Sequence, residues 1–119
     1  MSFRFEDLQI WNASNAFATK IYTIARALPR SEQYGLGDQL RRAANSIPVN
    51  IAEGAGSTSK KDFAHFLNIA IRSLYEVVSL MFRCEQEGYL SQKRRTDAYQ
   101  DAELLVKRVH AFRGKLIRE

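Results

Sequence analysis

The residue types that most often perform catalysis are present, but no spacing joins them into a site. The two histidines, His65 and His110, fall in different predicted helices, and neither belongs to a His-x-x-Glu metal pair. The single cysteine, Cys84, cannot build a structural zinc site, which needs about four protein ligands. Residues 54–57, Gly-Ala-Gly-Ser, follow a predicted helix rather than a strand, so they do not fit a nucleotide-binding loop. We therefore predict a non-enzyme with no catalytic residues, no metal and no cofactor.

Basic residues form the second group whose chemistry suggests a function. The chain has a net charge of +5, and residues 90–119 alone contribute +4. Such an excess favours anionic partners such as nucleic acid, although on charge alone a solvated helix face is the simpler explanation. Because no exposed aromatic ladder accompanies the basic residues, we expect binding without sequence specificity. The candidate nucleic-acid-binding residues are Lys60, Lys61, Lys93, Arg94, Arg95, Lys107, Arg108, Arg113 and Lys115.

Four predicted helices must position these residues, and they span residues 5–28, 34–52, 59–87 and 92–117. Three signals mark the ends of the first three helices, namely Pro29, the pair Gly54 and Gly56, and Gly88. Ser59 and Ser91 have the side chains of N-caps. Connections of about 4–6 residues make successive helices antiparallel neighbours. We therefore predict one all-α domain, residues 1–119, folded as an antiparallel up-down-up-down four-helix bundle.

Pro48 is the local anomaly of the second predicted helix. It lacks a backbone N–H and its ring clashes with the carbonyl of Ala44, so we predict a kink or a break near residues 45–47. Two short helices in succession are the alternative. On a roughly continuous helix, Arg42 and Glu53 share a face, and an internal bridge between them is a better explanation than catalysis. The polar residues interpreted as structural are Arg42, Ser46, Asn50 and Glu53.

The third predicted helix is more apolar than one bundle requires. On a helical wheel its apolar residues cover an arc of roughly 220°, whereas a core-facing helix needs only about 100°. Either long side chains of neighbouring helices cover the surplus or another subunit does, and we favour the subunit. The predicted interface residues of this homo-oligomer are Phe66, Ile69, Leu80 and Phe82.

The composition is consistent with a cytoplasmic protein. Hydrophobic residues make up 45% of the chain and charged residues 26%, as in ordinary globular domains. A lone cysteine cannot form an intramolecular disulfide, which fits a reducing compartment. The first seven residues contain no apolar run of the signal-peptide kind, and polar residues interrupt residues 67–81, so no membrane span is predicted.

Residues 42–54 carry a family resemblance; they read Arg-Ala-Ala-Asn-Ser-Ile-Pro-Val-Asn-Ile-Ala-Glu-Gly. With them go Phe-Glu-Asp-Leu at residues 5–8 and Tyr-Gly-Leu at residues 34–36. A third motif reads Asp-Phe at residues 62–63 and Phe-Leu-Asn-Ile-Ala at residues 66–70. Over about residues 5–90 the chain resembles the bacterial four-helix-bundle proteins encoded in intervening sequences of large-subunit ribosomal RNA genes. This family is similar to the accessory variability protein of diversity-generating retroelements.

The resemblance implies a homo-oligomer, typically a homopentameric ring of bundles. For the retroelement branch it also implies binding of RNA or DNA and of a reverse transcriptase, whereas for the intervening-sequence branch no function is established. Two hypotheses follow. The first is a non-catalytic oligomeric accessory protein that binds nucleic acid non-specifically through its basic surface. The second is an oligomeric scaffold that recruits a protein partner without nucleic acid.

Overall fold

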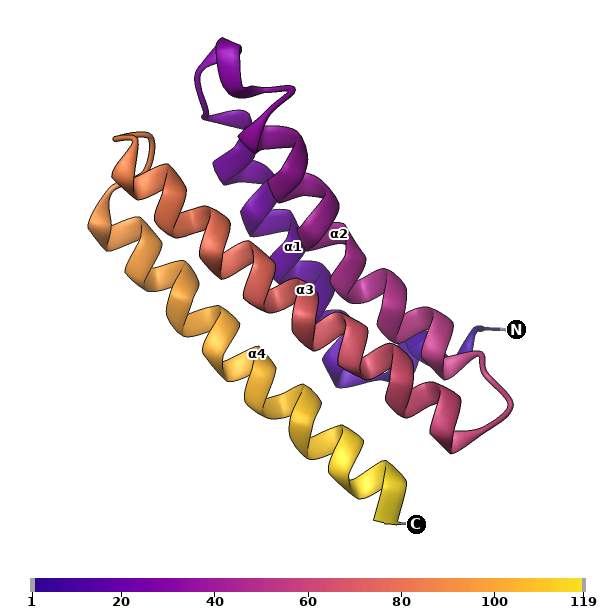
Figure 1. Cartoon of the computed structure of the whole chain (residues 1–119). Helices are drawn as coiled ribbons and strands as arrows, with labels where there is room; N and C mark the ends of the chain where they lie inside the picture. Colours follow the sequence, from indigo (N-terminus) through magenta and orange to yellow (C-terminus); the bar gives the residue numbers. More distant parts are fainter. Residues whose placement is uncertain (1, 119) are drawn as a thin grey trace.

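The computed structural model describes residues 2–118, which form four long helices and two short 3-10 turns (Figure 1). Successive helices run antiparallel, which confirms the predicted all-α bundle. Its elements in chain order are η1 (Arg4–Asp7), α1 (Gln9–Arg26), η2 (Arg30–Glu32), α2 (Leu36–Ala55), α3 (Lys60–Gln86) and α4 (Gln92–Arg118).

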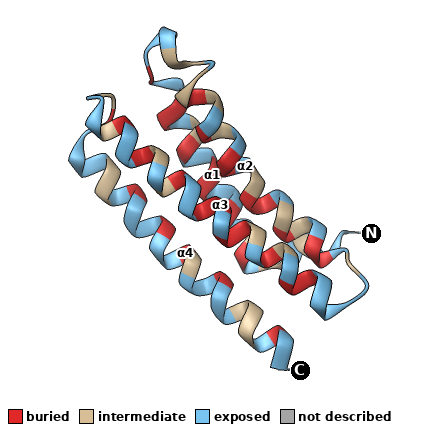
Figure 2. Ribbon diagram, in the orientation of Figure 1, coloured by how far each residue is buried: buried red, intermediate tan, exposed pale blue. Residues whose placement is uncertain are grey.

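The core lies along the axis of the bundle, where each helix turns one apolar stripe inward (Figure 2). Ile21 of α1, Leu40 of α2, Leu67 of α3 and Val109 of α4 are fully buried. Burying such side chains stabilises a fold by about 1.5–3 kcal/mol each, so the aligned stripes explain why these helices pack together. No helix in residues 2–118 is long and apolar enough to cross a membrane.

The start of the chain departs from the prediction of one helix over residues 5–28. Residues 4–7 form η1, and α1 begins only after Leu8, whose backbone is extended. The Asn12 side-chain amide donates to the carbonyl oxygens of Glu6 and Leu8, at 3.1 and 3.0 Å, across this junction. A local side-chain amide therefore replaces helical hydrogen bonds here, which the apolar spacing of the segment does not reveal.

α2 runs without interruption from residue 36 to residue 55 with Pro48 inside it. Of the kink or break predicted near residues 45–47, the break is therefore wrong. Pro48 and its neighbour Ile47 are buried, and this packing offsets the lost backbone hydrogen bond. Of the two glycines predicted to end the helix, Gly56 is its C-cap, whereas Gly54 lies inside the last turn. A Cβ at Gly54 would lie 2.8 Å from Phe63 Cδ1 and 2.9 Å from Phe66 Cβ, so this glycine permits the close approach of α2 and α3.

The predicted ends of α3 and α4 are confirmed. The Ser59 hydroxyl accepts the backbone N–H of Asp62 at 3.0 Å, and the Ser91 hydroxyl accepts that of Arg94 at 3.1 Å. Both serines are therefore N-caps. Gly88 follows α3 with a φ of 78°, the left-handed conformation that ends many helices.

The wide apolar arc of α3 is mostly covered within the chain itself. α3 lies between α2 and α4, so one flank of the arc faces α2 and the other faces α4 (Figure 1). Phe66, Ile69 and Leu80 are half-buried, while Phe82 packs against Tyr99 of α4 with ring centroids 6.1 Å apart. Neighbouring helices thus account for much of the surplus that we attributed to another subunit.

Candidate nucleic-acid interface

The two halves of α4 differ sharply in charge. Residues 92–103 contain three basic and three acidic side chains, whereas residues 104–118 contain five basic side chains and no acidic one. Charges of opposite sign in the first half can neutralise one another, but those of the second half cannot. The excess positive charge of the chain is therefore displayed by the second half of this helix.

In the first half of α4, Arg95 is engaged inside the fold. Its Nε lies 2.6 Å from Glu85 Oε1, and its guanidinium lies over the Phe82 ring at 4.4 Å from the centroid. The Arg95 side chain is only 16% exposed. We predicted that Arg95 contacts phosphate, but in the structure its guanidinium contacts Glu85 and Phe82 of the same chain. The sequence run Lys93-Arg94-Arg95 gives no sign of these contacts.

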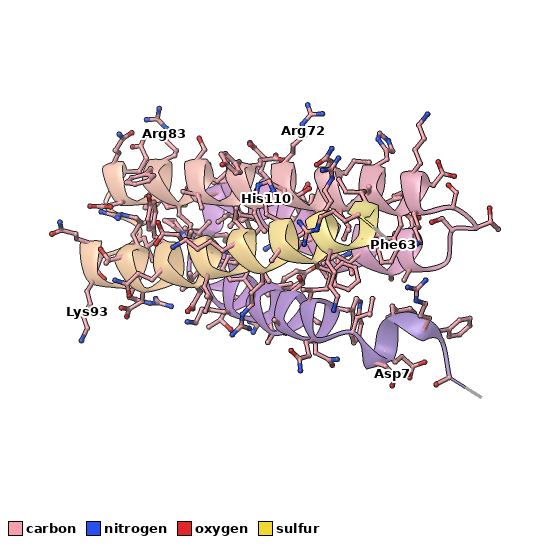
Figure 3. The ribbon with its side chains drawn as sticks, turned by 90° about the horizontal axis from the view of Figure 1, so that it is seen from below. Asp7, Phe63, Arg72, Arg83, Lys93 and His110 are labelled. Atoms are coloured by element: carbon pink, nitrogen blue, oxygen red, sulfur yellow. The ribbon has the colours of Figure 1, made fainter. Side chains whose placement is uncertain are left out.

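Lys93 and Arg94 are exposed in the first turn of α4. Lys93 lies at the opposite end of the bundle from Phe63, which is in the first turn of α3 with Lys60 and Lys61 (Figure 3). A rise of about 1.5 Å per residue places Lys93 roughly 33 Å from Lys115 along the axis of α4. The nine predicted nucleic-acid-binding residues therefore do not form one surface. Lys93, Arg94 and Arg95 lie at one end of the α3–α4 hairpin, and Lys60, Lys61, Arg113 and Lys115 lie at the other. Lys107 and Arg108 lie between them along α4.

A basic cleft lies where α3 begins and α4 ends, with a volume of about 430 Å³. Within residues 2–118 its lining contains no carboxylate. The Arg113 Nε donates to the carbonyl oxygen of Ala64 at 3.2 Å, which fixes the arginine stem against α3. The residues that line this basic cleft are Lys60, Lys61, Ala64, His65, Asn68, Arg113 and Ile117.

The first turn of α3 strengthens the positive potential of the basic cleft. Helix N-termini carry a partial positive charge from unpaired backbone N–H groups, and Lys60 and Lys61 lie on that turn. Asp62 lies on the same turn but does not line the cleft. The end of the hairpin is held by apolar packing, since the Phe63 and Phe112 rings lie 5.5 Å apart. The two lysines are exposed and free of ion pairs among residues 2–118, so their charges are available to a ligand.

The remaining predicted basic residues lie on other parts of α4. Lys107 lines a groove between α3 and α4, and Arg108 lines a groove between α1 and α4. In that second groove the Lys20 ammonium pairs with the Asp101 carboxylate. Lys115 is exposed near the end of the helix. Lys107 and Arg108 therefore lie on opposite flanks of α4, and only Lys107 shares the α3–α4 side with the basic cleft.

The groove between α3 and α4 contains two exposed tyrosine rings, which the sequence did not single out. Tyr75 is 65% exposed and Tyr99 is 37% exposed. We call this feature the aromatic groove, and its volume is about 270 Å³. Its lining residues are Leu74, Tyr75, Val78, Tyr99, Ala102, Glu103, Val106 and Lys107.

The polar residues of α2 are only partly arranged as predicted. The Asn50 amide donates to the Ser46 hydroxyl at 2.9 Å, and the Ser46 and Ser73 hydroxyls share a hydrogen bond of 2.9 Å. This chain of side chains joins α2 to α3, which fits the structural role predicted for Ser46 and Asn50. Arg42, however, pairs with Asp38 one helical turn away at 3.1 Å. The predicted Arg42–Glu53 bridge is therefore wrong, because both side chains are exposed and a nearer carboxylate is available.

Two titratable groups near the opposite end of the bundle have altered acidity. Burial raises the pKa of the Cys84 thiol, with a smaller effect from the Glu32 carboxylate. Burial also raises the pKa of Tyr89, whose hydroxyl donates to Glu32 Oε2 at 3.2 Å. Both groups stay protonated near neutral pH, so neither is an activated nucleophile. Within residues 2–118 no group of three or more potential ligands is placed to hold a metal ion.

The family of the chain follows from its sequence match over residues 6–111 to the model of the 23S rRNA-intervening sequence proteins. The chain belongs to this family. The match includes the α3 side of the basic cleft but ends before Arg113 and Ile117, and it confirms the resemblance carried by residues 42–54. No curated protein matches the chain.

A solved structure has the same four-helix fold as this chain. It is described as a protein of unknown function from the S23 ribosomal protein family from Bacteroides thetaiotaomicron. The two chains are 22% identical and superpose with a TM-score of 0.81, over 87% of this chain and 97% of the other. The similarity establishes the four-helix fold.

Proposed function

We propose that the protein is a non-catalytic accessory protein that binds nucleic acid non-specifically through phosphate contacts. The observation that supports this function best is the excess of positive charge where α3 begins and α4 ends. There Lys60, Lys61 and Arg113 line a cleft without carboxylates, and residues 104–118 add positive charge beside it. Positive surfaces of this kind bind phosphate through release of counterions, without reading base sequence.

We further propose that the functional unit is a homo-oligomer. Half-buried Phe66, Ile69 and Leu80 lie on the α2 flank of α3, and Val49 of α2 is exposed as well. A second copy that covers these side chains would remove apolar area from water. The resemblance of the sequence favours a homopentamer and, by analogy with retroelement accessory proteins, a reverse transcriptase as a protein partner. An assembly on this flank leaves the basic cleft open.

A structural scaffold that recruits a protein partner without nucleic acid is the second candidate. The observation that favours it is the exposed apolar surface of the aromatic groove, which a partner helix would fill. The two functions differ in their dependence on salt, because apolar docking does not release phosphate counterions.

Fluorescence anisotropy with a labelled structured RNA, measured across a salt series, tests nucleic-acid binding. We expect affinity at low salt that falls linearly as the logarithm of salt concentration rises. No affinity at low salt would contradict the proposal and favour the scaffold. Light scattering on dilute protein tests assembly separately, and the mass of a monomer would contradict the homo-oligomer.

A further inference from the structure

The basic cleft and the aromatic groove are neighbours along one seam between α3 and α4. Asn68 lines the cleft and Tyr75 lines the groove, seven residues farther along α3, which is about 10 Å. On α4, Arg113 and Lys107 occupy the corresponding positions. Figure 3 shows the two helices side by side, with Phe63 at the end where the cleft lies. Cationic groups and exposed rings are therefore within reach of one short ligand.

We propose that this seam binds single-stranded nucleic acid, with backbone phosphates in the basic cleft and an unpaired base stacked on Tyr75. The proposal rests on the proposed function and adds the form of nucleic acid that is recognised. Stacking of bases on aromatic side chains next to a positive groove is the general way in which proteins hold single strands. A duplex keeps its base faces inside the stack, so it gains nothing from an exposed ring.

The charges of the seam favour a polyanion over an apolar helix of a protein partner. The cleft offers Lys60, Lys61 and Arg113, and Lys107 continues the positive charge into the groove. The only carboxylate that lines either cavity within the described residues is that of Glu103. Glu103 precedes Lys107 by four residues on α4, a spacing at which the lysine offsets its charge.

Tyr75 is the ring that a base can reach. It is 65% exposed, whereas Tyr99 is 37% exposed and has one edge against Phe82. Its side chain makes no hydrogen bond within residues 2–118, so removing the ring costs the fold little. Tyr34 offers a matched control, since it is 95% exposed in the connection between α1 and α2, away from the seam.

The test is anisotropy with two labelled RNAs of equal length, an oligouridine strand and a hairpin duplex, at low salt. We expect the single strand to bind more tightly than the duplex. Tyr75→Ala is expected to weaken single-strand binding about five- to hundredfold, whereas Tyr75→Phe, which keeps the ring, retains it. Tyr34→Ala is expected to bind like the unmodified protein.

Three outcomes overturn parts of the account, and they are distinguishable. Equal binding of both RNAs with no effect of Tyr75→Ala would overturn the stacking site and leave the proposed function intact. No binding of either RNA would overturn the proposed function as well. A change in the mass of the assembly on Tyr75→Ala, measured by light scattering, would assign the aromatic groove to a second copy of this chain and overturn the single-strand site.

Discussion

The two ends of the α3–α4 hairpin use charged side chains in opposite ways. At the loop end, residues 83–95, Arg95 pairs with Glu85 and stacks on Phe82. At the open end, residues 60–68 and 109–118, aromatic packing of Phe63 on Phe112 holds the helices together. Lys60 and Lys61 at this end make no ion pair within residues 2–118 and are left for a ligand. The loop end therefore uses Arg95 to hold the fold, whereas the open end keeps its two lysines at the surface.

This difference shows that the density of basic residues along the sequence is a poor guide to a binding surface. The densest run, Lys93-Arg94-Arg95, includes a residue whose charge is neutralised inside the fold. The basic cleft instead draws Lys60 and Lys61 from one helix and Arg113 from another, which are about 50 residues apart in the chain. The antiparallel fold brings these charges together and keeps acidic side chains out of the cleft.

The largest effect is expected from a change that disturbs the apolar packing of the open end. Gly54→Ala places a Cβ within 3.0 Å of both Phe63 and Phe66, so we expect the free energy of unfolding to fall by about 1–3 kcal/mol. Urea unfolding monitored by circular dichroism measures this free energy. The control is Gly56→Ala, where the nearest atom would lie at 3.5 Å and little change is expected. Equal effects of the two variants would show that close packing does not hold this end.

A smaller loss is expected at the loop end from Arg95→Ala. The variant removes the guanidinium from Phe82 and leaves the half-buried Glu85 carboxylate without its partner, which should cost about 1–2 kcal/mol of stability. Arg94→Ala, an exposed neighbour with the same charge, should change stability by less than about 0.5 kcal/mol. If the two variants unfold at the same urea concentration, the contacts of Arg95 with Glu85 and Phe82 do not stabilise the loop end.

The smallest effect concerns alkaline pH at the loop end. Because the pKa of Tyr89 is raised in the folded protein, the unfolded chain loses this proton first as pH rises. The contribution of Tyr89 is therefore complete below the ordinary tyrosine range and is lost as pH rises through the folded pKa. Tyr89→Phe should make the decline in unfolding free energy above about pH 10 shallower. An unchanged slope would contradict the contact with Glu32.

The sequence allowed the bundle to be predicted because its signals are local. Ser59, Ser91 and Gly88 act within one turn of their helices, and the apolar stripes need only the helical period. The break at Pro48 was wrong because packing between helices decides whether a proline is tolerated. Gly54 was misassigned for the same reason, since its role depends on Phe63 and Phe66 of another helix.

The candidate site was less predictable because it depends on which basic side chains make ion pairs or stacking contacts inside the folded chain. Nothing in the run of residues 93–95 distinguishes Arg95 from Arg94, yet only Arg95 reaches Glu85 and Phe82. The aromatic groove left a weak signal, since Tyr75 follows Asn68 by seven residues and thus lies on the same face of α3. The groove itself could not be predicted, because it also depends on where Tyr99 of the facing helix lies.

The central claim is that nucleic acid binds at the open end, and that binding does not simply follow the net charge of the chain. Two double variants test it, Lys60→Gln with Lys61→Gln at the open end and Lys93→Gln with Arg94→Gln at the loop end, since each removes two positive charges. Binding of oligouridine is measured across a salt series for both. We predict that the open-end variant loses affinity, and that the slope of log affinity against log salt concentration falls in magnitude by about 1.4, or 0.7 per phosphate contact. The loop-end variant should keep most of its affinity and most of this slope. Equal losses in the two variants would contradict the account.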